Sequence, residues 1–351
     1  MHILQRFSLE ALIVGFIGGY IFALFQLPLP WVLGSLSAIT IFQAFTKRKI
    51  VFQPTYKDIG LVTLGAYFGL YFTISTFTIV TPFIIPYIIA TSILILVSII
   101  MSTLVTKWIP IDQVTSVFSS IPGGLTEMAV ASEALHAKSA YVVIFQTVRL
   151  VSVLFIVPPL IITIFSPADT LASSPTIGSL ESLSLDWTYT LYLIPIIGGY
   201  LLRNIIPAGI VVGSMVITIL IHLFMLPLPT IPDVILLIAQ VFIGISLGKS
   251  IHIPDLKAGG KYGFIYFIIT LLLIATSFVL AYFFSLLTGV DIKTSLLSLA
   301  PGGLIEMVLT ASQVGADPAL VSAFQLTRIL VIILCVPGAL KWYFHYKSSK
   351  N

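Results

Sequence analysis

The sequence predicts an all-α membrane protein of about ten transmembrane helices in two inverted repeats, each with a broken or re-entrant element. Three observations lead to this prediction. The 351-residue chain is 58% hydrophobic and only 9% charged, whereas an ordinary soluble domain carries about 25% charged residues. Several apolar runs reach about 18 residues, the length that crosses a bilayer core. A Pro-Gly-Gly motif also occurs twice, beginning at Pro122 and at Pro301, which is an offset of 179 in the numbering.

The apolar segments divide into five per half, separated by short polar or proline-containing stretches. Arg6 is the only basic residue before the first segment, and no small-residue cleavage site follows it, so we expect a retained helix. The first membrane repeat is predicted over residues 1–165 and the second over 188–351. The predicted spans lie near residues 8–27, 31–46, 58–80, 81–106, 139–165, 188–204, 208–226, 233–248, 262–287 and 317–340.

The distribution of lysine and arginine predicts the orientation. With a cytoplasmic N-terminus and five crossings per half, 13 of the 17 basic residues face the cytoplasm and only Lys293 lies outside. Six crossings per half would place four more outside: Arg203, Lys249, Lys257 and Lys261. The positive-inside rule favours five. We therefore expect a multi-pass protein of a bacterial-type cell (plasma) membrane, with both termini cytoplasmic and the Ser/Pro-rich segment 166–187 as an external linker.

The repeated motif is Pro-Gly-Gly-Leu-x-Glu-Met. Proline and two glycines end a helix and free backbone groups, which membrane proteins tolerate only where the backbone is buried in protein or lines a cavity. We therefore predict broken or re-entrant elements over about residues 113–136 and 294–315, close together near the bilayer midplane. The predicted substrate- or ion-binding residues of the motif are Pro122, Gly123, Gly124, Glu127, Pro301, Gly302, Gly303 and Glu306.

Glu127 and Glu306 fall in the first turn of the helix that follows each break. A free helix N-terminus carries partial positive charge and unpaired N–H groups, so it binds anions. We interpret the glutamates as proton or cation sites beside a solute-binding opening. The alternative is that each glutamate caps its own helix. The cost of a carboxylate in apolar surroundings favours the functional interpretation.

Each motif is followed by a glutamine and an arginine three residues apart, hence on one helix face. These are Gln146 and Arg149 in the first half, and Gln325 and Arg328 in the second. An arginine within an apolar span needs a partner, and we expect Glu127 and Glu306 in that role, within a half or across halves. Such pairs either fix helix packing or exchange the carboxylate for an anionic substrate.

Other residues match between the halves in the same order. Gly18-Gly19-Tyr20 matches Gly198-Gly199-Tyr200, and Gly34 matches Gly213. These glycines are expected to permit close helix contacts. A second set of matches has a different spacing: Pro54 with Pro229, Asp58 with Asp233 and Gly69 with Gly244.

Composition excludes several classes of protein. A single cysteine, Cys335, rules out a disulfide framework within the chain, and the five histidines are not paired at metal-ligand spacing. We expect no metal, no cofactor and no enzymatic activity. The basic residues lie between apolar runs and leave no room for a DNA-reading domain. The expected partners are the lipid bilayer and a small solute or ion, without direct nucleic-acid binding.

The duplicated motif, with Phe-Gln-x-x-Arg downstream, resembles the AbrB-duplication family of polytopic membrane proteins over residues from about 8 to 340. Members carry labels that include regulator of gene expression and ammonia monooxygenase. This sequence lacks a metal constellation, so we do not expect the monooxygenase activity that one of these labels names. It also lacks a soluble DNA-binding domain, so we expect any effect on transcription to be indirect.

The expected function is secondary transport or export of a small solute. The alternative is a membrane-bound regulator that acts indirectly on gene expression. A membrane enzyme would need a nucleophile–base pair or a metal cluster, and the sequence shows neither.

Overall fold

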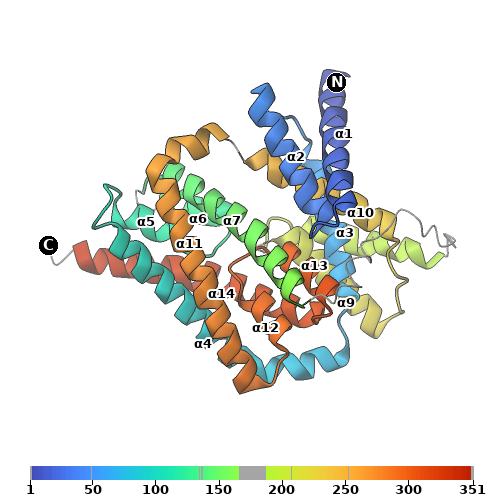
Figure 1. Cartoon of the computed structure of the whole chain (residues 1–351). Coiled ribbons are helices and arrows are strands. Elements are labelled where there is room, and N and C mark those ends of the chain that lie inside the picture. The colour runs from blue at the N-terminus through green and yellow to red at the C-terminus, as the bar shows by residue number, and fades with distance from the viewer. Residues whose placement is uncertain are drawn as a thin grey trace. The chain divides into compact units, whose positions relative to one another are not determined.

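The computed structural model describes residues 2–48, 50–133, 135, 137–165, 187–206, 208–251 and 253–348 (Figure 1). Within these ranges the regular secondary structure is helical throughout. Five helices have the length and apolarity of a membrane span: α4 (Ile74–Val105), α7 (Ser139–Phe165), α10 (Asp233–Ser250), most of α11 (Ile253–Thr288) and most of α14 (Pro318–Ser348). The protein is therefore an all-α membrane protein. Of the expected linker, residues 166–186 lie outside the described residues.

The other predicted spans correspond to the helices α1 (His2–Leu24), α2 (Pro30–Thr46), α3 (Pro54–Gly69), α8 (Leu193–Leu202), which follows the 3-10 helix η2 (Trp187–Tyr192), and α9 (Gly209–Phe224). One boundary differs from the prediction. The expected 58–80 segment ends early, at Gly69, and α4 continues through Pro82 and Pro86. Proline is tolerated inside membrane helices when the freed backbone groups find other partners, so these prolines do not end the helix.

Six helices of the first half pair with six of the second at a constant offset of 179 between their first residues. Two of the pairs consist of short helices: α5 (Gln113–Ser120) with α12 (Ile292–Leu299), and α6 (Leu125–Glu133) with α13 (Leu304–Val314). The other pairs are α2 with α9, α3 with α10, α4 with α11 and α7 with α14. The spacing of the motif is thus also the spacing of these helices.

This register corrects one set of sequence matches. At a spacing of 179, Pro54 corresponds to Asp233 and Gly65 to Gly244. The matches of Asp58 with Asp233 and of Gly69 with Gly244 are therefore wrong by four residues. Four residues make about one helical turn, so the shifted match still places small residues on the same helix face. Inversion of the halves relative to the membrane stays a prediction.

The helices form two compact units, and each unit draws on both halves of the sequence. Unit 1 comprises Met1–Phe77 and Ile161–Ile253, and unit 2 comprises Thr78–Leu160 and Pro254–Asn351. Unit 1 contains α1–α3 and α8–α10. Unit 2 contains most of α4, α7 and α11, together with α5, α6 and α12–α14. This division cuts across the two predicted repeats, and both Pro-Gly-Gly motifs belong to unit 2.

Unit 1 packs helix backbones against one another at glycines. A methyl group at Gly65 of α3 would overlap the carbonyl oxygen of Val211 in α9. The equivalent contact, at the same offset in the numbering, joins Gly244 of α10 to the carbonyl oxygen of Val32 in α2. Only glycine permits this approach, which brings backbones into van der Waals contact.

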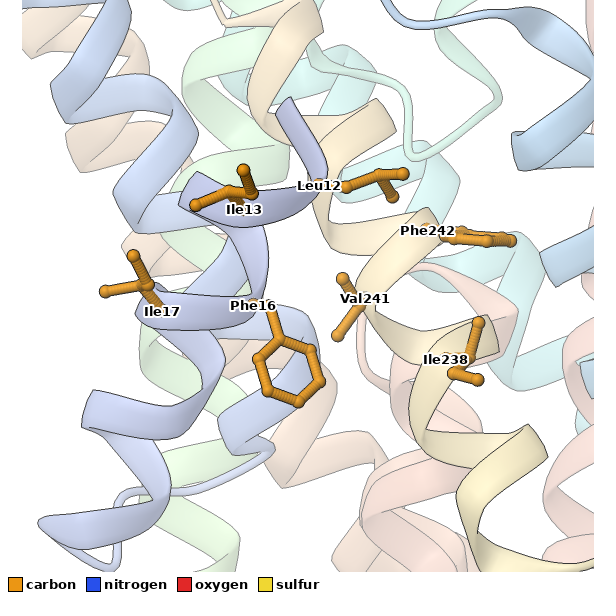
Figure 2. A pocket seen from close by; sticks show the side chains of 7 residues that line it. All are labelled: Leu12, Ile13, Phe16, Ile17, Ile238, Val241 and Phe242. Atoms are coloured by element: carbon orange, nitrogen blue, oxygen red, sulfur yellow. The ribbon is translucent and has the colours of Figure 1, made fainter. Parts of the chain in front are cut away.

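An apolar groove runs between α1 and α10 on unit 1 (Figure 2). It has a volume of about 420 Å³, and its lining carries aliphatic and aromatic side chains: Leu12, Ile13, Phe16, Ile17, Ile238, Val241 and Phe242. This groove offers no polar side chain that could orient a polar solute. The polar, repeated motifs belong to unit 2 instead.

Candidate functional site

Each Pro-Gly-Gly break joins two short helices of unit 2. The first break lies between α5 and α6, and the second between α12 and α13. Ile121 and Ala300, which precede the prolines, have extended backbones with φ/ψ of −63°/130° and −55°/134°. Such a conformation is the preference of a residue before proline. Each break therefore ends one helix, leaves its last carbonyl groups unpaired and starts another helix.

Two side chains of α7 hold the first break. Gln146 Nε2 donates to the carbonyl oxygens of Phe118 at 2.6 Å and Ile121 at 3.1 Å. Arg149 donates from Nη1 to the Ile121 oxygen, and from Nη2 to the Gly123 oxygen at 2.8 Å. These acceptors are carbonyl groups at the end of α5 and in the break. We term this arrangement the first clamp.

The second clamp, on α14, repeats the first. Gln325 Nε2 donates to the carbonyl oxygens of Leu297 at 2.7 Å and Ala300 at 3.5 Å. Arg328 donates from Nη1 to the Ala300 oxygen, and from Nη2 to the Gly302 oxygen at 2.7 Å. Every donor and acceptor is related to its counterpart by the offset that relates the two motifs. The structure thus gives the glutamine and the arginine a common task in each half, which is to satisfy the broken backbone.

Arg328 does not have the partner within its own half that the sequence suggests. Arg328 contacts carbonyl oxygens and Gln325 Oε1, and it forms no ion pair with Glu306. The predicted Glu306–Arg328 pair is therefore wrong. The physical reason is that each break leaves carbonyl oxygens without their helical donors. These oxygens lie within reach of the guanidinium, so the arginine satisfies them and they satisfy the arginine. The side chain of Glu127 lies outside the described part of the structure, so its pairing with Arg149 stays a prediction.

Glu306 lies at the start of α13 and is only 4% exposed. Its carboxylate folds back against Gly303, the residue before the helix, where a methyl group would overlap Glu306 Oε2. The N–H groups of a first helical turn have no partner within the helix and carry partial positive charge. The geometry is therefore that of a glutamate held at its own helix N-terminus, and Gly303 provides the space for it.

We term each break together with its two short helices a hairpin. Each of the long helices α4 and α11 contacts the hairpin of the other half of the sequence through one tyrosine. Tyr87 of α4 donates to the Ser298 carbonyl oxygen at 2.8 Å, and its ring stacks on Phe324 with centroids 4.7 Å apart. Tyr266 of α11, which is the equivalent residue of the second half, repeats this role in the first hairpin. Each half of the sequence thus braces the break of the other half.

Tyr266 donates to Ser116 Oγ at 2.8 Å and stacks on Phe145 with centroids 4.0 Å apart. Sequence reasoning missed both tyrosines. Extending the comparison of the two halves upstream of the motif, at the same offset, would have found them, because Tyr87 and Tyr266 are the same residue at equivalent positions.

The two breaks approach each other through the clamp helices. A methyl group at Gly123 would lie 3.1 Å from Ile332 of α14, one turn beyond Arg328. Equivalently, a methyl group at Gly302 would lie 3.1 Å from Val153 of α7, one turn beyond Arg149. Unit 2 therefore gathers both breaks and both arginines in one region.

Polar side chains of the hairpins are buried in this region. Those of α5 and α12 are Thr115, Ser116, Ser119, Ser120, Thr294, Ser295 and Ser298. Three buried clamp atoms have no hydrogen-bond partner: Gln146 Oε1, Arg149 Nε and Arg328 Nε. Among the described residues, no three His, Cys, Asp or Glu side chains are grouped as metal ligands. The described groups of this region offer hydrogen bonding and charge.

Residues 9–344 match the family described as "Transition state regulatory protein AbrB". The chain is also similar to a Bacillus subtilis (strain 168) protein named "Uncharacterized protein YhjN", with 25% identity over 361 aligned positions that cover 95% of this chain and 92% of the relative. No solved structure matches the chain. Because the family match spans nearly the whole sequence, the protein belongs to this AbrB family.

Proposed function

We propose that the protein is a secondary transporter of a small solute, with its binding site at the two clamped breaks of unit 2. The observation that carries the proposal is the reciprocal geometry of the breaks, each held by one clamp and packed against the helix of the other. Paired broken helices from two repeats are the usual construction of secondary-transporter sites, because the freed backbone groups and helix ends bind the solute.

Energetic considerations favour a functional role for the clamps over a purely structural one. Unbroken apolar helices would need no buried guanidinium groups, and well-packed apolar replacements of buried charged networks are often neutral or stabilising. Arg149 and Arg328 are nevertheless only 7% and 2% exposed. Ionisable groups buried within membrane spans commonly mark substrate or ion pathways.

The helix arrangement supports five crossings in each half. Excluding the hairpin helices, the first half contains α1–α4 and α7, and the second contains α8–α11 and α14. An odd number of crossings inverts the second half relative to the first, which alternating access in many transporters exploits. Together with the basic residues, this count supports cytoplasmic termini in a plasma membrane.

Topology is tested by labelling with an impermeant thiol reagent in intact cells. In a Cys335→Ala background, a cysteine at Ser174 is expected to react from outside, and a cysteine at Ser348 only after the membrane is permeabilised. Equal reactivity of the two positions before permeabilisation would contradict the proposed orientation.

Transport is tested with purified protein in proteoliposomes, by measuring gradient-driven uptake of a panel of labelled small anions, cations and neutral solutes. We expect uptake of at least one solute, lost in Gly302→Val, where Met307 and Val153 already crowd the added carbons. A matched control is Gly338→Val, with open space around the glycine. Absence of uptake for every solute by folded protein would overturn the proposal.

A second candidate function is that of a membrane-bound regulator acting indirectly on gene expression. It is favoured by the family description, which names a regulatory protein. Deleting the gene and restoring it with the Gly302→Val variant separates the two roles. Transcript levels restored by a transport-inactive variant would favour regulation, whereas restoration only by the active protein would make regulation a consequence of transport.

A further inference from the structure

The clamp arginines have hydrogen-bond donors that the protein leaves unused. A guanidinium carries five N–H donors in a fixed fork. Both Nη atoms of each clamp arginine donate to carbonyl oxygens of the break. Both Nε atoms are buried and have no partner. An unpaired buried donor is unfavourable, and most severely so on a charged group, so these positions are suited to an acceptor that arrives from outside the chain.

Each clamp brings one guanidinium group to its break. The acceptors of these two cations are neutral: backbone carbonyl oxygens in both clamps and, for Arg328, also the side-chain oxygen of Gln325. The helices α6 and α13 begin at the breaks and bring the positive ends of their dipoles there. In the second hairpin, the carboxylate of Glu306 lies at the start of α13. A bound anion at a helix N-terminus would take the same position.

We infer that the transported solute is a small anion, held by the Nε–H groups of Arg149 and Arg328 and by the N–H groups at the starts of α6 and α13. This inference rests on the proposed transport function and specifies its substrate class. The clamps have two roles in this arrangement, because the same guanidinium that satisfies the broken backbone also presents a donor to the solute. Glu306 competes with the solute for the start of α13.

Binding is tested first on the purified full-length protein in detergent. Sodium acetate, sodium succinate, sodium phosphate, ammonium and choline are each added at constant ionic strength, with Tm and calorimetric affinity as readouts. We expect at least one of the three anions to bind and raise Tm, and we expect neither cation to do so. Failure of all three anions to bind, or equal binding of a cation, would overturn the inference.

Variants at the clamps then locate the binding. Arg149→Lys and Arg328→Lys keep the charge, but a lysine ammonium lacks the planar fork that reaches two carbonyl groups and a third acceptor together. We expect each to weaken binding of the anion at least about tenfold. Arg203→Lys is the matched control, because Arg203 is 40% exposed and belongs to unit 1. Unchanged affinity in both clamp variants would contradict the assignment.

Glu306→Gln gives an independent test that does not depend on the stability of the lysine variants. It removes a negative charge from the start of α13 and keeps the side-chain shape. An interaction of a charge with a helix end has a typical strength that corresponds to about a two- to fivefold change in affinity. We therefore expect the anion to bind about two- to fivefold more tightly. Unchanged or weaker binding would overturn the proposed competition and, with it, the anion site at α13.

Uptake by proteoliposomes distinguishes failure of this inference from failure of the proposed function. Uptake of the bound anion supports both. Uptake of only a cation or a neutral solute, with equal rates in wild type and Arg149→Lys, would preserve transport and overturn the anion assignment. Anion binding with no uptake of any solute would overturn transport and leave the binding site standing.

Discussion

Unit 1 packs its helices backbone to backbone at glycines, whereas unit 2 packs around polar side chains that reach a broken backbone. In unit 1, Gly65 and Gly244 lie directly on carbonyl groups of neighbouring helices. In unit 2, Arg149 and Arg328 bring donors to carbonyl groups that have lost their helical partners. The comparison shows two ways in which one apolar protein fixes the positions of its helices. Unit 1 depends on excluded volume, and unit 2 depends on hydrogen-bond donors.

The largest effect is expected from added volume in unit 1. Gly65→Leu would push a side chain into the Val211 carbonyl oxygen and Ser214 Oγ. Overpacking typically costs about 1–3 kcal/mol where side chains can shift. A clash with backbone cannot be relieved by a rotamer change, so we expect a cost well above this range and little folded protein. The measurement is the yield of monodisperse protein and its Tm. Gly338→Leu, where no atom lies nearby, is the control; equal yields would contradict the role of glycine packing.

Loss of a clamp donor is expected to have the next largest effect. Arg328→Met removes one donor from the Ala300 carbonyl oxygen, and it removes the arginine donor from the Gly302 carbonyl oxygen and from the side-chain oxygen of Gln325. Hydrogen bonds to charged groups contribute about 1.5–3 kcal/mol each. Arg149→Met removes two such bonds rather than three, because Gln146 Oε1 has no partner.

We therefore expect both methionine variants to lower Tm, with Arg328→Met the more severe. Arg203→Met on unit 1 serves as the comparison, and we expect a smaller loss because Arg203 is exposed and makes only one ion pair and one ring contact among the described residues. If the two clamp variants were as stable as wild type, hydrogen bonding to the breaks would not hold unit 2 together, and the contrast between the units would fail.

The bracing tyrosines should give smaller and nearly equal effects. Tyr87→Phe and Tyr266→Phe keep the ring stacking and remove one buried hydroxyl hydrogen bond each. The expected loss is about 0.5–1.5 kcal/mol for each variant, measured as a change in Tm. Tyr282→Phe is the control, because Tyr282 is 55% exposed. Strongly unequal losses would show that the two hairpins are not braced equivalently.

Much of this architecture follows from sequence pattern. Apolar runs located the long helices, and the repeated Pro-Gly-Gly identified both breaks, because no other residues interrupt a helix so effectively. The spacing of Gln146 and Arg149 placed both on one helix face, where they act together. These features depend on residues close in sequence, whose relative positions are determined by helix geometry.

The partners of the arginines were not predictable in the same way. Charge alone suggested Glu306 for Arg328, but the acceptors are carbonyl oxygens 26 to 28 residues upstream. Because every residue has a backbone carbonyl group, the sequence does not indicate which carbonyl oxygens will accept hydrogen bonds from an arginine. Each unit combines segments from both halves of the sequence, and so it also depends on contacts between distant segments, such as Tyr87 with Ser298. A repeated break predicts that carbonyl groups need donors, but only the packed structure shows which donors reach them.

The smallest effect is expected from the ion pair of unit 1. Arg203 Nη1 lies 3.0 Å from Asp58 Oδ2, with side chains that are 40% and 14% exposed. Exposed pairs contribute about 0.2–1 kcal/mol, because water screens the charges and ordering long side chains costs entropy. Arg203 also lies 5.8 Å from the centroid of the Tyr200 ring, a contact that contributes about 0.5–1 kcal/mol at exposed sites. Arg203→Ala should therefore lower stability more than Asp58→Ala. A double-mutant cycle isolates the ion pair, and a coupling energy well above about 1 kcal/mol would show that unit 1, too, depends on charge for its packing.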